Sequence, residues 1–93
     1  MSERTREYRE AVKAVRAILD QYDPEGLRAI GAPDDEYDPE AHDLVRFVLG
    51  TTTPTPETVQ ATWHRWFATE LRPDLAEAIN GDLQRLRAAI PEP

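Results

Sequence analysis

Hydrophobic positions recur at helical spacing in four separate segments of the chain. In residues 3–22 they are separated by steps of three and four residues, which places them along one side of a helix. The residues that form this stripe are Tyr8, Val12, Val15, Leu19 and Tyr22. Asp23-Pro24 ends the segment, because the residue before a proline disfavours the helical conformation. The spacing therefore predicts a helix over residues 3–22.

A capping residue followed by proline marks the start of two further helices. The pairs are Asp38-Pro39 and Thr55-Pro56, in which the first residue can cap a helix and the proline fits its first turn. The predicted helices cover residues 39–49 and 56–71. Five apolar residues of the longer helix are expected to face inward, namely Val59, Trp63, Trp66, Phe67 and Leu71.

A fourth stripe covers residues 73–90 and consists of Leu75, Ile79, Leu83, Leu86 and Ile90. Asn80-Gly81 interrupts it and could form a turn, with Asp82 capping a separate last helix. Because the stripe keeps its phase across this pair, we expect one continuous helix. No alternating pattern indicates a strand. The chain is therefore predicted to be all-α, a small four-helix bundle-like domain over residues 1–93, with one long acidic loop between the first two helices.

Composition narrows the class of protein. Ninety-three residues suffice for one domain, and the absence of cysteine excludes disulfides and thiolate metal sites. No apolar run is long enough for a membrane span, so we expect a cytoplasmic protein without a membrane partner. Ten of the eleven basic residues are arginine, which, with the many alanines, suggests a bacterial source.

Negative charge is concentrated in one block. Residues 20–43 hold nine acidic side chains and a single basic one, so the net charge of this segment is −8. The remainder of the chain has a net charge of +1, which gives −7 in total. Such a surface repels nucleic acid and attracts a basic protein. We expect four acids of the loop to steer this partner, with Tyr37 as an aromatic anchor. The four are Asp34, Asp35, Glu36 and Asp38.

The same acids allow two other interpretations. They could be solvated or capping groups, with Asp38 as the helix cap and Glu40 near the positive end of the helix. They could also bind a hard cation, but the spacing of an EF-hand loop is absent. We predict no catalytic residue, metal or cofactor. The alternative is a metal- or small-molecule-dependent enzyme or ligand-binding protein that uses this loop. Homo-oligomerisation is not predicted.

A second motif follows the first predicted helix. In Tyr22-Asp23-Pro24-Glu25-Gly26 the aspartate can bond to nearby amides, the proline fixes its own φ, and the glycine can adopt a left-handed conformation. These residues predict a sharply defined structural turn. Because well-defined loops often carry function, a site built on this turn is a second hypothesis.

This turn and residues 33–38, Pro-Asp-Asp-Glu-Tyr-Asp, together resemble the paired signature of the YugE-like family of small bacterial proteins. The family usually has tryptophan at the position of Tyr22 and an apolar residue at that of Glu25. The resemblance covers residues 18–50 and implies a helical fold without catalytic residues. Similar signatures occur in small proteins that resemble immunity partners of bacterial toxins.

Three further polar residues are candidates for chemistry. Glu70 falls within the apolar stripe of residues 56–71, so it is a candidate buried acid that would need an ion pair, such as one with Arg28 or Arg46, or release to solvent at a frayed helix end. His42 lies one turn after Asp38, but no nucleophile or third ligand accompanies this pair. We therefore interpret both His42 and His64 as ordinary surface or boundary residues.

Overall fold

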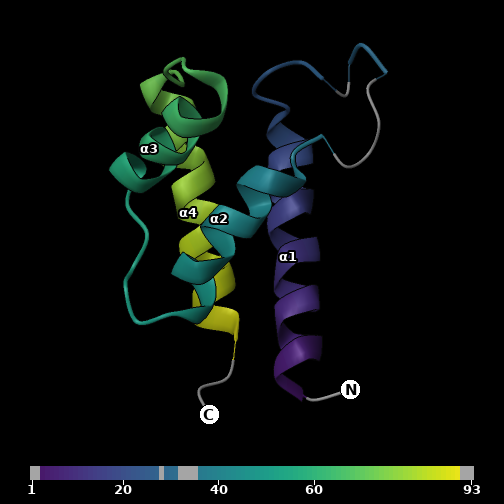
Figure 1. The fold of residues 1–93 in the computed structure, drawn as a ribbon. Coiled ribbons are helices and arrows are strands. Elements are labelled where there is room, and N and C mark those ends of the chain that lie inside the picture. Colours follow the sequence, from purple (N-terminus) through teal and green to yellow (C-terminus); the bar gives the residue numbers. More distant parts are fainter. Residues whose placement is uncertain (1–2, 28, 32–35, 91–93) are drawn as a thin grey trace.

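The structure, a computed structural model, describes residues 3–27, 29–31 and 36–90. It contains four α-helices, and the described residues include no strand (Figure 1). The helices are α1 (Glu3–Tyr22), α2 (Asp38–Leu49), α3 (Pro56–Phe67) and α4 (Pro73–Ala89). The all-α prediction is thus confirmed for this part of the chain. None of these helices is long and apolar enough to cross a membrane.

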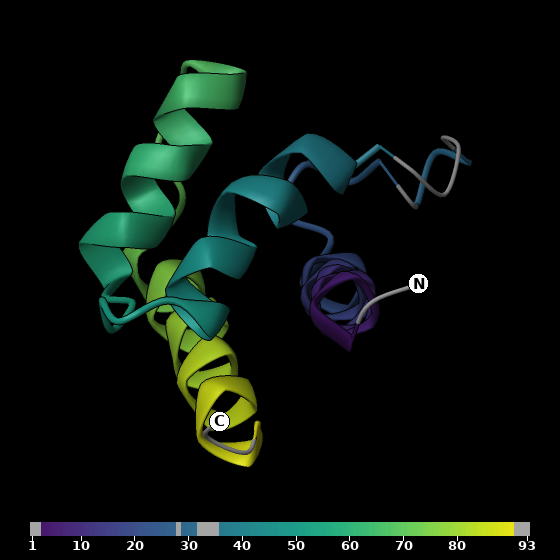
Figure 2. The ribbon, with the colours of Figure 1, turned by 60° about the horizontal axis from the view of Figure 1, so that its bottom comes forward.

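Helices α2 and α4 connect the other elements of the fold. Each of them contacts all three other helices, whereas α1 and α3 do not contact each other. Figure 2 shows α2 lying across the space between α1 and the pair formed by α3 and α4. One side of α2 is consequently buried over its whole length, while the opposite side faces solvent.

The core is formed by the stripes that the sequence predicts. Fully buried apolar side chains come from all four helices, and Trp63 of α3 is the largest of them. The others in the helices are Val15, Leu19, Ala41, Leu44, Val45, Val59, Ala76, Ile79 and Leu83. Burial of a large aliphatic side chain contributes roughly 1.5–3 kcal/mol, so these contacts are the main source of stability in a chain without disulfides.

Helix α3 is shorter than the predicted 56–71. It starts as expected, because the Thr55 hydroxyl accepts a hydrogen bond from the backbone N–H of Thr58. It ends at Phe67, where Ala68 turns the chain with a left-handed φ of 55°. The prediction that Trp66 faces inward is wrong, since this side chain is 44% exposed.

The chain beyond Phe67 still returns one apolar side chain to the core. Leu71 is buried although it lies outside the helix. Gln60 fixes its position, because the Gln60 amide donates to the Leu71 carbonyl at 2.8 Å and accepts from the Leu71 N–H at 2.9 Å. A side-chain to backbone clamp therefore replaces the last helical turn that the hydrophobic spacing predicts.

The ends of α2 differ from the predicted capping. Tyr37 rather than Asp38 occupies the N-cap position, and no side chain caps the helix there. Asp38 is instead the first residue of α2. At the other end, Arg87 of α4 donates hydrogen bonds to the carbonyls of Phe47 at 2.9 Å and Gly50 at 2.6 Å. A cation from α4 thus satisfies the free carbonyls at the end of α2.

Helix α4 is continuous, as predicted. Asn80 and Gly81 lie inside it, and the side chain of Asn80 is buried. The alternative in which Asp82 caps a separate helix is therefore wrong. Asp82 lies in mid-helix, where its carboxylate contacts another helix instead.

Candidate functional site

The turn after α1 has a strained backbone. Asp23 has a φ of 45° and Gly26 a φ of 69°, and a positive φ is uncommon for any residue other than glycine. Hydrogen bonds hold the turn in this form. The N–H of Gly26 donates to the Asp23 carbonyl at 2.9 Å, and the N–H of Ala29 donates to Oδ2 of Asp23 at 3.1 Å. The predicted turn is therefore present.

Tyr37 connects this turn to the start of α2. Its hydroxyl donates to Oδ1 of Asp23 at 2.8 Å and accepts from the N–H of Glu25 at 3.0 Å. The side chain is 0% exposed, and burial raises the pKa of its hydroxyl to about 12. The expectation that Tyr37 anchors a partner is consequently wrong, because no partner can reach it.

Two more contacts attach the turn to the rest of the molecule. The carboxylate of Glu25 accepts a hydrogen bond from Nε1 of Trp63 at 2.7 Å, although Glu25 itself is exposed. The hydroxyl of Tyr22 donates to Oδ2 of Asp82 on α4 at 2.7 Å. This hydrogen bond is the main reason that the pKa of Asp82 is lowered and that of Tyr22 is raised.

A pocket of about 270 Å³ lies between this turn and the link from α3 to α4. We call it the turn pocket. The turn and the link that line it are at the end of the molecule opposite the start of α1 and the end of α4 (Figure 1). Its charged lining comprises three acids and one arginine, namely Asp23, Glu25, Glu70 and Arg72. Its apolar lining includes Leu71 and Leu75. The pocket thus combines negative charge with aliphatic surface.

Glu70 is not a buried acid, and its exposure agrees with the alternative of release to solvent at the helix end. Because α3 ends at Phe67, Glu70 lies in the link to α4 and is exposed at the rim of the turn pocket. Of the two arginine partners considered, Arg28 lies outside the described residues and Arg46 forms no ion pair with Glu70. No hydrogen bond or ion pair holds its carboxylate among the described residues, so that group remains available to a ligand.

Among the described residues, the buried acid is Glu40. It is 3% exposed, and its Oε2 has no hydrogen-bond partner among the described residues. Loss of hydration raises the pKa of the carboxyl, and the nearby carboxylates Asp43, Glu36 and Asp38 raise it further. The signal in the sequence is its spacing, since Glu40 stands one helical turn before Leu44 on the buried side of α2.

The structure separates the acids predicted to bind a partner. Asp34 and Asp35 lie outside the described residues. Glu36 is exposed. Asp38 is half-buried, and its Oδ1 lies 3.2 Å from Nη1 of Arg16, so it joins the loop to α1. Among the described residues of this set, only Glu36 presents an unpaired carboxylate to solvent.

Neither histidine lies in a group of three possible metal ligands among the described residues. His42 is exposed, and its Nδ1 lies 2.8 Å from the hydroxyl of Tyr8. His64 is also exposed. Within the part of the chain that the structure describes, no three histidine, aspartate or glutamate side chains are placed to hold a metal ion.

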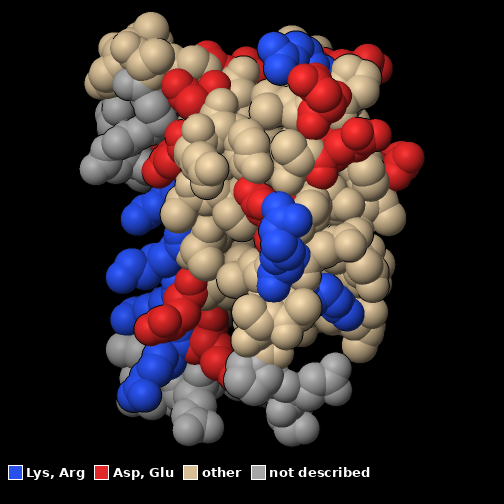
Figure 3. Space-filling view, turned by 180° about the vertical axis from the view of Figure 1, so that it is seen from behind, with Lys and Arg blue, Asp and Glu red and all other residues tan. Residues whose placement is uncertain are grey.

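Further acids from the second half of the chain lie at the same end as the turn pocket. In Figure 3, acidic side chains gather at the upper end of the molecule, whereas basic ones form a column along the edge made by α1. Exposed acids around the start of α4 are Glu70, Asp74 and Glu77. The acidic block of residues 20–43 is therefore not the sole source of the negative surface. The charge along the sequence does not predict this contribution, because these three acids lie far from the block in the chain.

Comparisons with known proteins give no match to this chain. No protein-family model matches the chain. No curated protein and no solved structure matches it either. The resemblance to the YugE-like family therefore stays a prediction based on the turn and on residues 33–38.

Proposed function

We propose that this protein is a non-enzymatic protein-binding module that receives a basic segment of a partner at the turn pocket. The observation that carries this proposal is the lining of the pocket, in which the carboxylates of Asp23, Glu25 and Glu70 accompany the aliphatic surface of Leu71 and Leu75. Lysine and arginine have a matching character, with an aliphatic stem and a cationic head.

The three acids contribute in different ways. Asp23 and Glu25 already accept hydrogen bonds from Tyr37 and Trp63, so they supply fixed negative charge. Glu70 is exposed and has no partner among the described residues, so it is the group that can pair directly with an incoming cation. Fixed groups lower the cost of ordering the site when a ligand binds.

Long-range charge supports the same partner. The net charge of −7 attracts a basic protein and accelerates its encounter at low ionic strength. Asp34, Asp35 and Glu36 would add to this steering, as the sequence predicts. An immunity-type role, with a basic toxin as the partner, is the form of this proposal that the family resemblance favours.

The test uses a basic peptide and the indole N–H signal of Trp63. A deca-arginine peptide is titrated into ¹⁵N-labelled protein, and the indole N–H signal of Trp63 is followed because this group bonds to Glu25. We expect a saturable shift that weakens as salt is added. A deca-glutamate peptide should cause no shift.

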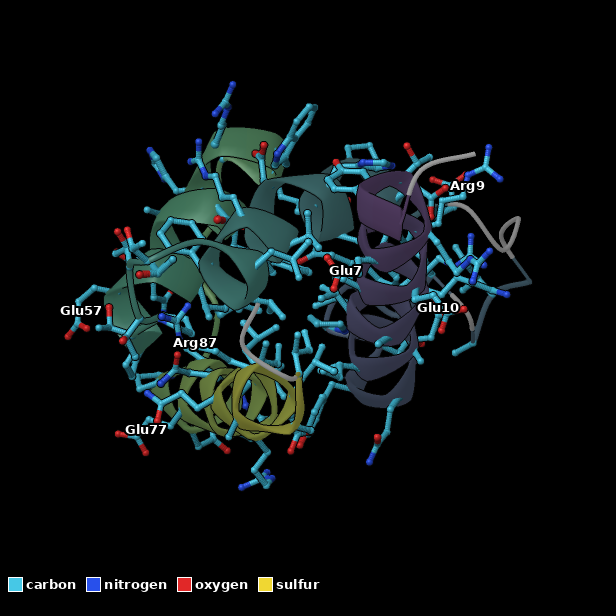
Figure 4. The ribbon with its side chains drawn as sticks, turned by 90° about the horizontal axis from the view of Figure 1, so that it is seen from below. Glu7, Arg9, Glu10, Glu57, Glu77 and Arg87 are labelled. Atoms are coloured by element: carbon cyan, nitrogen blue, oxygen red, sulfur yellow. The ribbon has the colours of Figure 1, made fainter. Side chains whose placement is uncertain are left out.

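Glu70→Lys should weaken binding by about 3- to 10-fold, since it replaces an attractive charge at the pocket by a repulsive one. The matched control is Glu10→Lys, which changes the net charge equally but lies on α1, where Figure 4 shows the side chain pointing away from the other helices. An equal loss in both variants would show that the peptide responds to net charge alone, and it would refute a site at the turn pocket.

A further inference from the structure

The solvent side of α2 carries an unusual set of side chains. Its exposed residues follow one another at helical spacing, and they are Pro39, His42, Arg46 and Leu49. Helix α2 is at the front of Figure 1, between α1 and α3. We define the α2 face as a surface of six residues. Three of them lie on α2 and are His42, Arg46 and Leu49. The other three flank α2 and are Tyr8 of α1 and Arg65 and Trp66 of α3.

Two exposed aromatic side chains flank the α2 face. Tyr8 of α1 is 41% exposed, and its hydroxyl lies 2.8 Å from Nδ1 of His42. Trp66 of α3 is 44% exposed, and its Nε1 donates to Oδ2 of Asp43 at 2.6 Å. Each ring is thus held by a polar contact to α2 while much of its surface stays in water. Tyrosine, tryptophan and arginine are the residues that most often dominate the energy of protein interfaces.

The charge available on this face is positive. The guanidinium of Arg46 has no ion pair or hydrogen bond with the described residues, and its central carbon lies 5.1 Å from the centre of the Phe47 ring. The Arg65 side chain is 64% exposed, and its nearest acid, Asp43, lies 3.7 Å away and already accepts from Trp66. Although this protein is acidic overall, the α2 face thus carries two cations that point outward, and the carboxylate beside them is already hydrogen-bonded.

We propose that the α2 face binds an acidic, leucine-bearing segment of a second protein. Carboxylates of that segment would pair with Arg46 and Arg65, and its apolar side chains would cover the exposed rings of Tyr8 and Trp66. Nucleic acid is disfavoured as the occupant because the net charge of −7 repels phosphates. This proposal does not depend on the turn pocket, which has the opposite charge.

The probe is an amphipathic helical peptide of glutamate and leucine, titrated into ¹⁵N-labelled protein. We expect the indole N–H signal of Trp66 to shift in a saturable way, while that of the buried Trp63 stays in place. The same peptide with lysine in place of glutamate should not shift Trp66. The two indoles thus report separately on the α2 face and on the turn pocket.

Arg46→Glu should weaken the binding of the glutamate-leucine peptide by about tenfold, because it removes one attraction and adds one repulsion. The matched control is Arg9→Glu, which changes the net charge equally. Arg9 is exposed and, in Figure 4, points away from α2. An unchanged Trp63 signal in both variants verifies that they fold.

Four results would overturn the proposal: no shift of Trp66, equal weakening in both variants, equal binding of the lysine peptide, or displacement of the glutamate-leucine peptide by oligo-uridylate. A shift of Trp66 that depends on protein concentration without peptide would assign the face to a second copy of this chain instead.

Discussion

The hydroxyl of Tyr37 donates a hydrogen bond to Oδ1 of Asp23 at 2.8 Å, across fourteen residues of sequence. Asp23 has a left-handed backbone conformation, which costs free energy in a residue with a side chain. The buried hydroxyl helps to hold Asp23 in that conformation. Tyr37, which lies in the second part of the sequence signature, thus stabilises the turn formed by the first part.

Tyr37→Phe should lower the free energy of unfolding by about 1–3 kcal/mol, because it leaves the Glu25 N–H and one oxygen of Asp23 without this partner. Urea denaturation measures the change. Tyr8→Phe is the control, since it removes the hydroxyl of an exposed ring and should change stability by about 0.5 kcal/mol or less. Equal effects of the two substitutions would show that the hydroxyl of Tyr37 does not stabilise the turn.

Two glycines should respond to alanine in opposite directions. Gly81 lies inside α4, and a Cβ there would meet only the Arg85 side chain, at an ordinary 3.6 Å. Gly81→Ala should therefore raise stability by about 0.5–1 kcal/mol, since alanine loses less conformational freedom in a helix. Gly26 has a φ of 69°, and Gly26→Ala should lower stability by about 1 kcal/mol because alanine is strained there. Thermal unfolding of both variants compares them, and a stabilised Gly26→Ala would contradict the role of the turn.

The helices were predictable because apolar spacing and proline-based starts are local signals. The stripe that runs from Leu75 to Leu86 continues through Asn80-Gly81, and the structure confirms one helix there. The end of α3 was not predictable in this way. Leu71 continues the helical spacing and is indeed buried, but the side chain of Gln60 rather than a helical turn places it. A hydrogen bond between residues eleven positions apart does not affect the spacing of the apolar residues, so that spacing cannot predict it.

The candidate site was predictable only in part. The turn at Asp23 and Gly26 follows from local residue types, whereas its contact with Tyr37 depends on tertiary structure. The exposure of an acid was the least predictable property. Glu70 was a candidate buried acid because the spacing extended a helix that stops early, whereas Glu40 was assigned to the positive end of a helix and its burial was not predicted.

Tyr22→Phe should destabilise the protein by about 1–2 kcal/mol at neutral pH, because the hydroxyl donates to the carboxylate of Asp82. The effect should depend on pH. The folded-state pKa of Asp82 is lowered, so the stability that this carboxylate contributes is present above its ordinary value of 3.8 and is lost as the pH falls toward the folded value. Urea denaturation between pH 2.5 and pH 7 should show the two proteins converging in acid. A difference that stays constant across this range would exclude the carboxylate as the cause.

Glu40→Gln should change the pH dependence of stability in the opposite sense. The folded-state pKa of Glu40 is raised above its ordinary value of 4.5, chiefly by burial, so the folded protein binds a proton more readily than the unfolded chain. In the window that starts near 4.5 and extends upward to the folded value, stability falls as the pH rises. At neutral pH the wild type must keep a buried carboxylate whose Oε2 has no partner, and glutamine removes that charge.

We therefore expect Glu40→Gln to be more stable than the wild type at pH 7 and to lose this advantage below about pH 4, where Glu40 is protonated in both folded and unfolded chains. Denaturation curves collected across this range measure the difference. Glu77→Gln is the matched control, because Glu77 is exposed and its replacement should change stability by no more than about 0.5 kcal/mol at any pH. A variant less stable than the wild type at pH 7 would show that the buried carboxylate stabilises the start of α2, and a partner for Oε2 would then have to be found.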